Sequence, residues 1–452
     1  MKKAIREEIL DGPILAPMLR LALPTIVVLI AQTMVGVAET FYVSFLGTNA
    51  LVGVALVFPI WMLMAMMSAG GIGGGVAAAV SRAIGGNRHA DAASLVWHAL
   101  ILAIVFGLIF TISMLLLGPS LYRALGGTGP SLAAALLYSK YIFFAAVPIW
   151  IVNLMSAVLR GSGNVRIPAL VTLGGAVILI PLSPAFIFGV GPVPGLALAG
   201  AGVAVTLYYL AAAIFLIRYM SAGKAELKLS ICRIEWRHFR SILAVGIISA
   251  LSAVQLNATV ILVTGAVGRF GAGALAGYGM ASRLDYVLIP MLFGMGTAVL
   301  TMVGTNVGAG NIARAKRIVW VGALVGAAVM ELVGIAFALF PGAWIGIFSN
   351  EPAVLTAGSG YLRIVGPFYG AIGLTFMLTF ASQGSGRPIW TFVGGTVRLT
   401  LAAGIGWLLV AVFSAPMSAL FAAIAVSVIC SATICAIATL SGATFRVLGE
   451  PS

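Results

Sequence analysis

The chain has 452 residues, of which 62% are hydrophobic and only 8% are charged, and its mean hydropathy is +1.15. So few charges cannot cover the surface of water-soluble domains of this size, whereas lipid solvates the exterior of a membrane protein. The net charge of +14 comes from short basic clusters between apolar runs, which is the pattern of the positive-inside rule. The composition therefore argues against a nucleic-acid-binding protein and indicates a polytopic protein of a bacterial inner membrane.

Apolar segments of about 20 residues, the length that crosses a bilayer as a helix, recur along the whole chain. In the first half they lie at 15–45, 50–80, 93–117, 135–159, 167–189 and 196–219. In the second half they lie at 239–267, 274–304, 315–340, 353–381, 389–412 and 416–441. We therefore predict an all-α polytopic membrane protein with 12 transmembrane helices. Its predicted parts are an N-lobe (1–220), a cytoplasmic linker (221–238) and a C-lobe (239–452).

The distribution of basic residues predicts the orientation of these spans. With the N-terminus inside, most Lys and Arg residues fall in cytoplasmic segments, and the opposite side holds only Arg123, Lys140, Arg269 and Arg363. An even number of spans then places both termini in the cytoplasm. The charge pattern thus describes a multi-pass protein in contact with the lipid bilayer, and no nucleic acid partner is expected.

The two halves of the sequence resemble each other. Arg160-Gly161-Ser162-Gly163 recurs as Gln383-Gly384-Ser385-Gly386, and the same spacing, the repeat offset, relates Gln32 to Gln255. The stretch from Gly85 to Trp97 likewise matches Gly308 to Trp320. Six spans per repeat give both halves the same orientation, so we predict two six-helix lobes related by a pseudo-two-fold axis along the membrane normal. Parallel repeats of this kind are a known plan of secondary transporters.

Polar residues inside the predicted spans of the first half are the candidates for ion coupling. Glu39 lies deep in the first span, where a carboxylate is costly unless it is paired or protonated, which suits a group that binds and releases a proton. Gln32 and Asn153 are amides that could hold this carboxyl. The alternatives are structural hydrogen bonds between helices. Pro24 removes a backbone hydrogen bond from the same span, and its kink is either static or coupled to transport.

The second half offers polar candidates as well. Gln255 and Asn257 are the counterparts of the first-lobe amides, and they line a substrate cavity or hold helices together. Arg283 and Asp285, at the start of the eighth span, do not share a helix face, and we predict structural or gating roles for them. Glu331, in the ninth span, is either a second coupling site or a buried hydrogen-bond donor, with Arg398 as a candidate partner.

Methionines are frequent in the second span and in its repeat counterpart. Flexible, polarisable side chains suit a promiscuous apolar cavity, although most methionines in membrane helices simply pack or meet lipid. The cavity candidates are Met62, Met66, Met280 and Met291. The glycine run 70–75 lacks the Gly-Lys-Ser/Thr ending of a phosphate-binding loop. The three cysteines Cys232, Cys430 and Cys435 form no metal motif, so neither a cofactor nor a metal is expected.

Several motifs together resemble those of the multidrug and toxic compound extrusion (MATE) family. They are Leu23-Pro24, Gln32, Glu39-Thr40, Leu46-Gly47, Ala50-Leu51, Pro59, the glycine run 70–75, Ser81-Arg82-Ala83-Ile84-Gly85, Arg160-Gly161-Ser162-Gly163, Ala281-Ser282-Arg283 and Gly308-Ala309-Gly310-Asn311. The resemblance covers almost the whole chain and implies a monomeric transporter, not an enzyme. It implies export of amphipathic, mainly cationic small molecules in exchange for H⁺ or Na⁺.

The sequence also departs from the family pattern. Glu39 stands where aspartate is commoner, and the positions that resemble the second-lobe carboxylates of NorM-like members hold Gln255 and Ile372 or Gly373. Leu179 and Ser183 occupy positions where DinF-like members often carry Asn and Asp. We place the chain nearer the proton-coupled DinF-like branch. The alternatives are a flippase for lipid-linked or polysaccharide precursors in the same superfamily and, in another class, a membrane receptor or sensor that does not transport.

Overall fold

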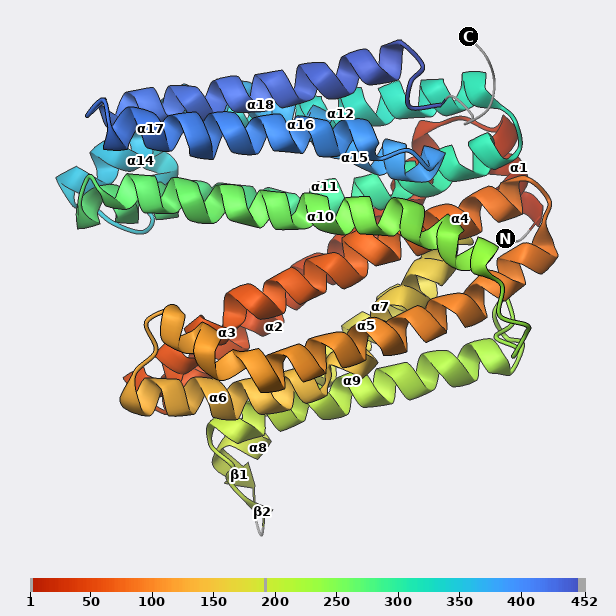
Figure 1. Ribbon diagram of the computed structural model, residues 1–452, viewed down its shortest axis with the longest axis horizontal. Helices are drawn as coiled ribbons and strands as arrows, with labels where there is room; N and C mark the ends of the chain where they lie inside the picture. Colours follow the sequence, from red (N-terminus) through yellow and green to blue (C-terminus); the bar gives the residue numbers. More distant parts are fainter. Residues whose placement is uncertain (1–2, 191–192, 446–452) are drawn as a thin grey trace. The chain divides into compact units, whose positions relative to one another are not determined.

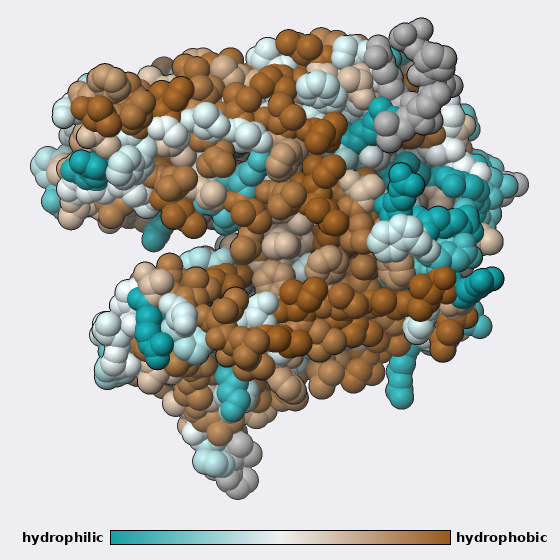
Figure 2. All heavy atoms as spheres, viewed as in Figure 1, coloured by the Kyte–Doolittle hydropathy of each residue, from teal (hydrophilic) through white to brown (hydrophobic). Residues whose placement is uncertain are grey.

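The computed structural model describes residues 3–190 and 193–445, which are predominantly helical (Figure 1). Within these residues, eleven helices are individually long and apolar enough to cross a membrane, and the consecutive helices α6 and α7, bent by 45° at their junction, supply a twelfth span. The predicted all-α fold with twelve spans is confirmed. Figure 2 shows mainly hydrophobic side chains along the flanks of the helices and hydrophilic ones near their ends.

The described part of the first half builds the helices α1 to α9 and a short hairpin. A π-helical turn, Met67–Ile72, joins α3 to α4 without a break. The helix α6 begins with a capping box, in which the backbone N–H of Thr128 donates to Ser131 Oγ at 3.3 Å. The elements are α1 (Lys3–Asp11), α2 (Leu15–Ser44), α3 (Thr48–Met66), α4 (Gly73–Gly85), α5 (His89–Ala124), α6 (Gly129–Phe144), α7 (Ala146–Gly161), α8 (Arg166–Phe188), β1 (Gly189–Val190), β2 (Val193–Pro194) and α9 (Leu198–Ser221).

The second half repeats this succession. A 3-10 turn, Gly366–Phe368, interrupts the tenth span at the position that corresponds to the α6–α7 junction in the first half. A π-helical turn, Thr400–Ile405, joins α16 to α17. The elements are α10 (Trp236–Gly268), α11 (Ala272–Gly308), α12 (Ile312–Leu339), α13 (Pro341–Ile345), α14 (Pro352–Val365), α15 (Tyr369–Ser385), α16 (Ile389–Leu399), α17 (Gly406–Ala411) and α18 (Met417–Leu440).

The chain forms two compact units. The first unit contains Met1–Ile5 and Pro24–Gly246, and the second contains Arg6–Leu23 and Ile247–Ser452. The chain therefore changes unit inside α2, after Leu23, and again inside α10, after Gly246. The repeat offset relates these two positions, so the two crossing points are equivalent. The lobe division at 220 and 239 remains a proposal, since the linker and the first turns of α10 group with the first unit.

Within the first unit, the beginning of α10 packs closely against α4. A Cβ atom on Gly75 would overlap the carbonyl oxygen of Ile242 and lie 2.8 Å from the backbone nitrogen of Gly246. Any larger side chain at this position would separate the two backbones. The glycine run that resembled no phosphate loop thus has a packing role at Gly75.

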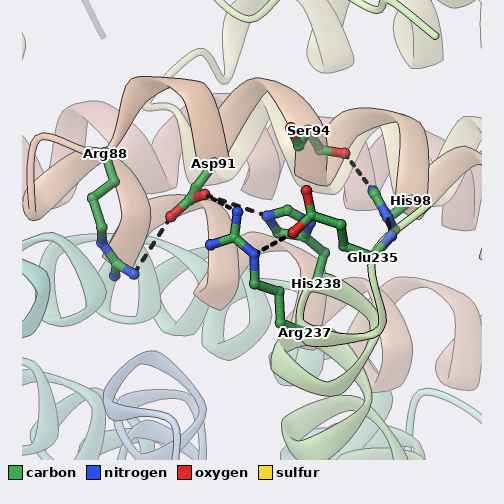
Figure 3. A network of polar contacts seen from close by, with 7 residues as sticks. All are labelled: Arg88, Asp91, Ser94, His98, Glu235, Arg237 and His238. Atoms are coloured by element: carbon green, nitrogen blue, oxygen red, sulfur yellow. Dashed lines mark hydrogen bonds and ion pairs between the residues drawn. The ribbon is translucent and has the colours of Figure 1, made fainter. Parts of the chain in front are cut away.

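Two histidines fasten the end of the linker to α5 in the same unit (Figure 3). His98 is fully buried, and its Nδ1 lies 2.8 Å from the carbonyl oxygen of Ser94, to which it donates. Its Nε2 accepts the backbone N–H of Glu235 at 3.0 Å, so this geometry requires the neutral ring. The rings of His98 and His238 are 4.8 Å apart. A linker residue is therefore held by a side chain that lies 137 positions earlier in the chain.

Charged residues surround the histidine pair at the surface (Figure 3). Asp91 accepts from Arg237 at 3.0 Å and lies 3.4 Å from Nε2 of His238 and 3.7 Å from Arg88. Arg237 also contacts Glu235 at 2.5 Å, and this hydrogen bond lowers the pKa of the Glu235 carboxyl below its ordinary value. These exposed ion pairs contribute little stability individually. The buried His98 contacts are the stronger anchor.

In the second unit, Arg314 of α12 holds the end of α1. Its Nε donates to the carbonyl oxygen of Ile9 at 3.0 Å, and a second guanidinium nitrogen donates to the carbonyl oxygen of Gly12. Asn306 donates to the same Ile9 oxygen at 3.3 Å. Carbonyl groups at a helix C-terminus lack intrahelical partners, and a cation satisfies them well. The repeat offset relates Arg314 to Asp91, which contacts Arg237 and His238 in the first turn of α10.

Candidate functional site

The carboxyl group of Glu39 is the central polar group of the first unit. Glu39 precedes Val43 by one turn of α2, and Val43 belongs to a buried apolar cluster with Ile187 of α8 and Leu198 of α9. Its Oε1 atom is buried, and within the described residues no donor forms a hydrogen bond with it. A buried oxygen without a donor loses its hydration without compensation. The structure thus places this carboxyl where binding of a proton or cation would relieve a cost.

Two tyrosines lie close to Glu39. Tyr138 of α6 and Tyr209 of α9 are both near enough to interact electrostatically with its carboxyl. Ser183 of α8 is fully buried, and its hydroxyl, like Glu39 Oε1, forms no hydrogen bond within the described chain. Ser183 precedes Ile187 by one turn, just as Glu39 precedes Val43. The groups that interact electrostatically with this carboxylate are thus tyrosine hydroxyls, where amides were expected.

The predicted amides do not gather at Glu39. Asn153 of α7 donates to Ser68 Oγ at 2.7 Å and so ties α7 to the π-helical turn. Gln32 is exposed on α2, about two turns before Glu39. Pro24 lies inside the continuous helix α2, at the point where this helix passes into the first unit. The roles proposed for Gln32, Asn153 and Pro24 remain predictions.

The second unit contains its own buried carboxyl, that of Asp285 in α11. The side chains of Tyr369, Arg398 and Tyr361 lie around it. The repeat offset relates Tyr361 to Tyr138, so each unit places the same repeat tyrosine next to its carboxyl group. The carboxyl groups themselves come from different spans, the first and the eighth. Arg283, which is close to Asp285 in sequence, instead lies with its guanidinium 5.7 Å from the ring of Phe348.

Two of the remaining polar candidates of the second unit, Gln255 and Glu331, form hydrogen bonds between helices. Gln255 of α10 donates to Thr396 Oγ1 of α16 at 2.8 Å. Asn257 donates to the carbonyl oxygen of Ala253 at 2.9 Å, within its own helix. Glu331 of α12 accepts the backbone N–H of Gly370 at 2.6 Å, near the beginning of α15. A carboxylate at a helix N-terminus satisfies an orphan donor and complements the helix dipole. These contacts support the structural interpretation of Gln255 and Glu331.

The candidate cavity methionines are half-buried. Met62 and Met66 belong to α3, and Met280 and Met291 belong to α11. The carbonyl oxygen of Met280 accepts the indole N–H of Trp344 at 2.9 Å. Their place in a substrate cavity remains a prediction. No group of three or more metal-ligating side chains is found in the part of the chain that the structure describes.

The MatE family model matches this sequence twice, over residues 24–185 and 247–408. The chain belongs to the MatE family. The repeat offset also relates the two matched ranges, and they begin at the points where α2 and α10 cross between the units. Members of this family are transporters and not enzymes. The receptor alternative is therefore set aside.

Relatives and solved structures agree with this MatE assignment. A FAD transporter from Shewanella oneidensis is 26% identical over 402 residues, covering 88% of each chain. A protein named "Probable multidrug resistance protein NorM", from Thermotoga maritima, is 27% identical over 396 residues, covering 85% of this chain and 84% of that one. A crystal structure of MATE in complex with MaD3S superposes with a TM-score of 0.89 at 22% identity, covering 99% of this chain and all of that one. The fold is thus that of the MATE transporters.

Sequence reasoning missed the tyrosines of this MatE protein. Tyr138, Tyr209, Tyr361 and Tyr369 were not candidates because tyrosine is common near membrane interfaces and in helix packing. One signal was available, since Tyr138 and Tyr361 are separated by the repeat offset. Applying that offset to every polar residue would have found this pair. Tyr209 and Tyr369 carry no such signal, because the matching positions hold Ala432 and Ala146.

Proposed function

We propose that this MatE transporter exports amphipathic, mainly cationic small molecules in exchange for protons, with Glu39 as the proton-carrying group. The observation that carries the proposal is the buried Glu39 Oε1 that no donor among the described residues reaches. Protonation neutralises this carboxyl, and a bound cation would compensate its charge, so the two ligands compete for one group. Competition of this kind is what exchange of a cation for a proton requires.

Comparison with Asp285 favours Glu39 as the proton carrier. Asp285 Oδ1 is also buried without a hydrogen bond among the described residues, but Asp285 lies next to the guanidinium of Arg398 and to two tyrosines, which offset part of the cost that burial imposes on its ionised form. For Glu39, within the described chain, no nearby cation contributes to its electrostatics. A carboxyl without a fixed counter-charge changes its protonation state more easily as access to the two sides of the membrane alternates. Asp285 then serves as a structural charge pair in the second unit.

A reconstituted exchange assay tests the assignment. Proteoliposomes receive tetraphenylphosphonium, and a pH gradient and a Na⁺ gradient are imposed separately. We expect the pH gradient to drive accumulation and Glu39→Gln to abolish it, while Glu351→Gln, at an exposed acidic residue outside the spans, retains it. Monodisperse elution and an unchanged Tm of Glu39→Gln show that the fold persists. Undiminished accumulation by Glu39→Gln, or accumulation driven by Na⁺ alone, contradicts the proposal. A precursor flippase predicts no accumulation under either gradient.

FAD is a second candidate substrate that the same assay can test. The relative from Shewanella oneidensis that matches over 88% of this chain is named a FAD transporter. FAD is an anionic amphipath, and Arg398 is a cation inside the second unit's spans that could attract such a group. The same proteoliposomes are therefore assayed with FAD. Transport of FAD that is insensitive to Glu39→Gln and lost in Arg398→Gln would replace the cationic cargo by an anionic one.

We further propose that the protein acts as a monomer in the bacterial inner membrane with both termini in the cytoplasm. The support is the bias of basic residues toward one set of loops. We also propose that the protein belongs to the proton-coupled DinF-like branch of the family. Labelling of single cysteines introduced at the two ends of the chain, in intact cells and in inverted vesicles, tests the orientation.

A further inference from the structure

One end of the second unit carries a groove that the transport mechanism does not use. The groove has a volume of about 450 Å³ and lies between the beginning of α12 and the end of α18, with Ile14 before α2 at its edge. In Figure 1 these ends of α12 and α18 lie at the same end of the second unit. Its lining is Ile14, Lys316, Arg317, Trp320, Val321, Leu324, Thr439 and Leu440.

Among the described residues, the charges of this groove have no counter-charge. Lys316 and Arg317 are exposed, and among the described residues neither forms a hydrogen bond or an ion pair. Two other basic residues of this unit have partners, since Arg20 pairs with Glu8 at 2.8 Å and Arg314 binds carbonyl oxygens. The two cations together form a site for a negative group.

The wall beside these cations is apolar and aromatic. Trp320 is half-buried, and Leu324 and Leu440 are 64% and 68% exposed. Trp320 is one turn, and Leu324 two turns, farther along α12 than Lys316, so the apolar wall continues toward the middle of the span. A site for a free inorganic anion would not need such a wall. Two cations at one end of an apolar wall match a molecule with an anionic headgroup and an acyl chain.

The repeat shows that this combination belongs to one half of the chain only. The tryptophan is present in both halves, as Trp97 and Trp320. The positions equivalent to Lys316 and Arg317 hold Ala93 and Ser94. The pair of cations is therefore not required by the helix packing that the repeats share.

We propose that this groove binds an anionic phospholipid of the cytoplasmic leaflet, with Lys316 and Arg317 on the headgroup phosphate and Trp320 and Leu324 along an acyl chain. The predicted orientation places the beginning of α12 at the cytoplasmic surface, where anionic lipids face basic pockets and tryptophans favour the interface. The proposal does not depend on the transported substrate or on the coupling ion.

Native mass spectrometry of the full chain, released from nanodiscs of phosphatidylcholine with one-fifth phosphatidylglycerol, tests the site. The test variant is the double substitution Lys316→Gln/Arg317→Gln. The matched control is Lys224→Gln/Lys228→Gln, which removes two exposed cations from the linker. We expect the wild type and the control to retain one phosphatidylglycerol. The test variant should lose it by a factor of roughly thirty, at about fivefold per cation.

Further measurements distinguish the contribution of the headgroup from that of the acyl chain. Leu324→Ser should weaken retention while leaving the cations intact, and an excess of inorganic phosphate should not displace the lipid. Equal retention by the wild type and the test variant would overturn the proposal, as would equal loss in the control variant, which indicates general surface charge. Displacement by inorganic phosphate would show a free-anion site and would also overturn it. Tm values in detergent confirm that each variant is folded.

Discussion

The contact between His98 and the linker makes a stability prediction that can be worked from the structure. His98→Ala removes the acceptor of the Glu235 N–H at 3.0 Å and the ring packed 4.8 Å from both His238 and Phe239. Losing the acceptor costs about 1–3 kcal/mol, and losing the aromatic contacts costs about 0.5–1.5 kcal/mol. We therefore expect the linker's attachment to weaken by about 1.5–4.5 kcal/mol, the sum of these two terms.

Hydrogen exchange measured by mass spectrometry on residues 222–240 checks this prediction. A loss of about 1.5–4.5 kcal/mol corresponds to exchange that is roughly ten to a thousand times faster, at about tenfold per 1.4 kcal/mol. His89→Ala is the matched control, because His89 is exposed on the same helix and, within the described part of the chain, forms a hydrogen bond only with Asn87, at 3.1 Å. His98→Gln, which can still offer an acceptor to the Glu235 N–H, should recover part of the protection. If the linker exchanges in His98→Ala as slowly as in His89→Ala, the buried contacts do not hold it.

Three other substitutions follow from single contacts. Glu331→Gln keeps an acceptor for the Gly370 N–H and should retain proton-driven transport. Glu331→Leu removes this acceptor and should lower Tm by several degrees. Loss of coupling in Glu331→Gln at a normal Tm would instead show that Glu331 is a coupling site. Gly75→Val should prevent α10 from packing on α4 and reduce the yield of folded protein. Gly36→Val, on α2 where no atom lies within 4 Å of the added Cβ, should leave the yield unchanged. Equal yields of the two variants would refute the close approach of α10 to α4. Arg314→Gln should free α1, seen as faster proteolysis of the N-terminus, and an unchanged cleavage rate would show that Arg314 is not its anchor.

Much of the architecture could be predicted from the sequence because its signals are local. A span needs about 20 apolar residues in succession, so composition along the chain located all twelve. The repeat was visible in the sequence as matched motifs at one offset. The same offset relates the positions at which α2 and α10 pass from one unit to the other, and it relates the two ranges of the family match. The depth of Glu39 also followed from its place in a span.

Only the tertiary structure decided which side chains meet. Glu39 interacts electrostatically with Tyr138 and Tyr209, and Glu331 accepts the backbone N–H of Gly370 near the beginning of α15. These choices depend on the rotation of each helix about its axis and on contacts between distant parts of the chain, which hydropathy does not encode. The same holds for His98 and the linker, 137 residues apart. Periodicity and composition thus determined the spans of this MatE transporter, and helix packing determined the partners of its charged groups.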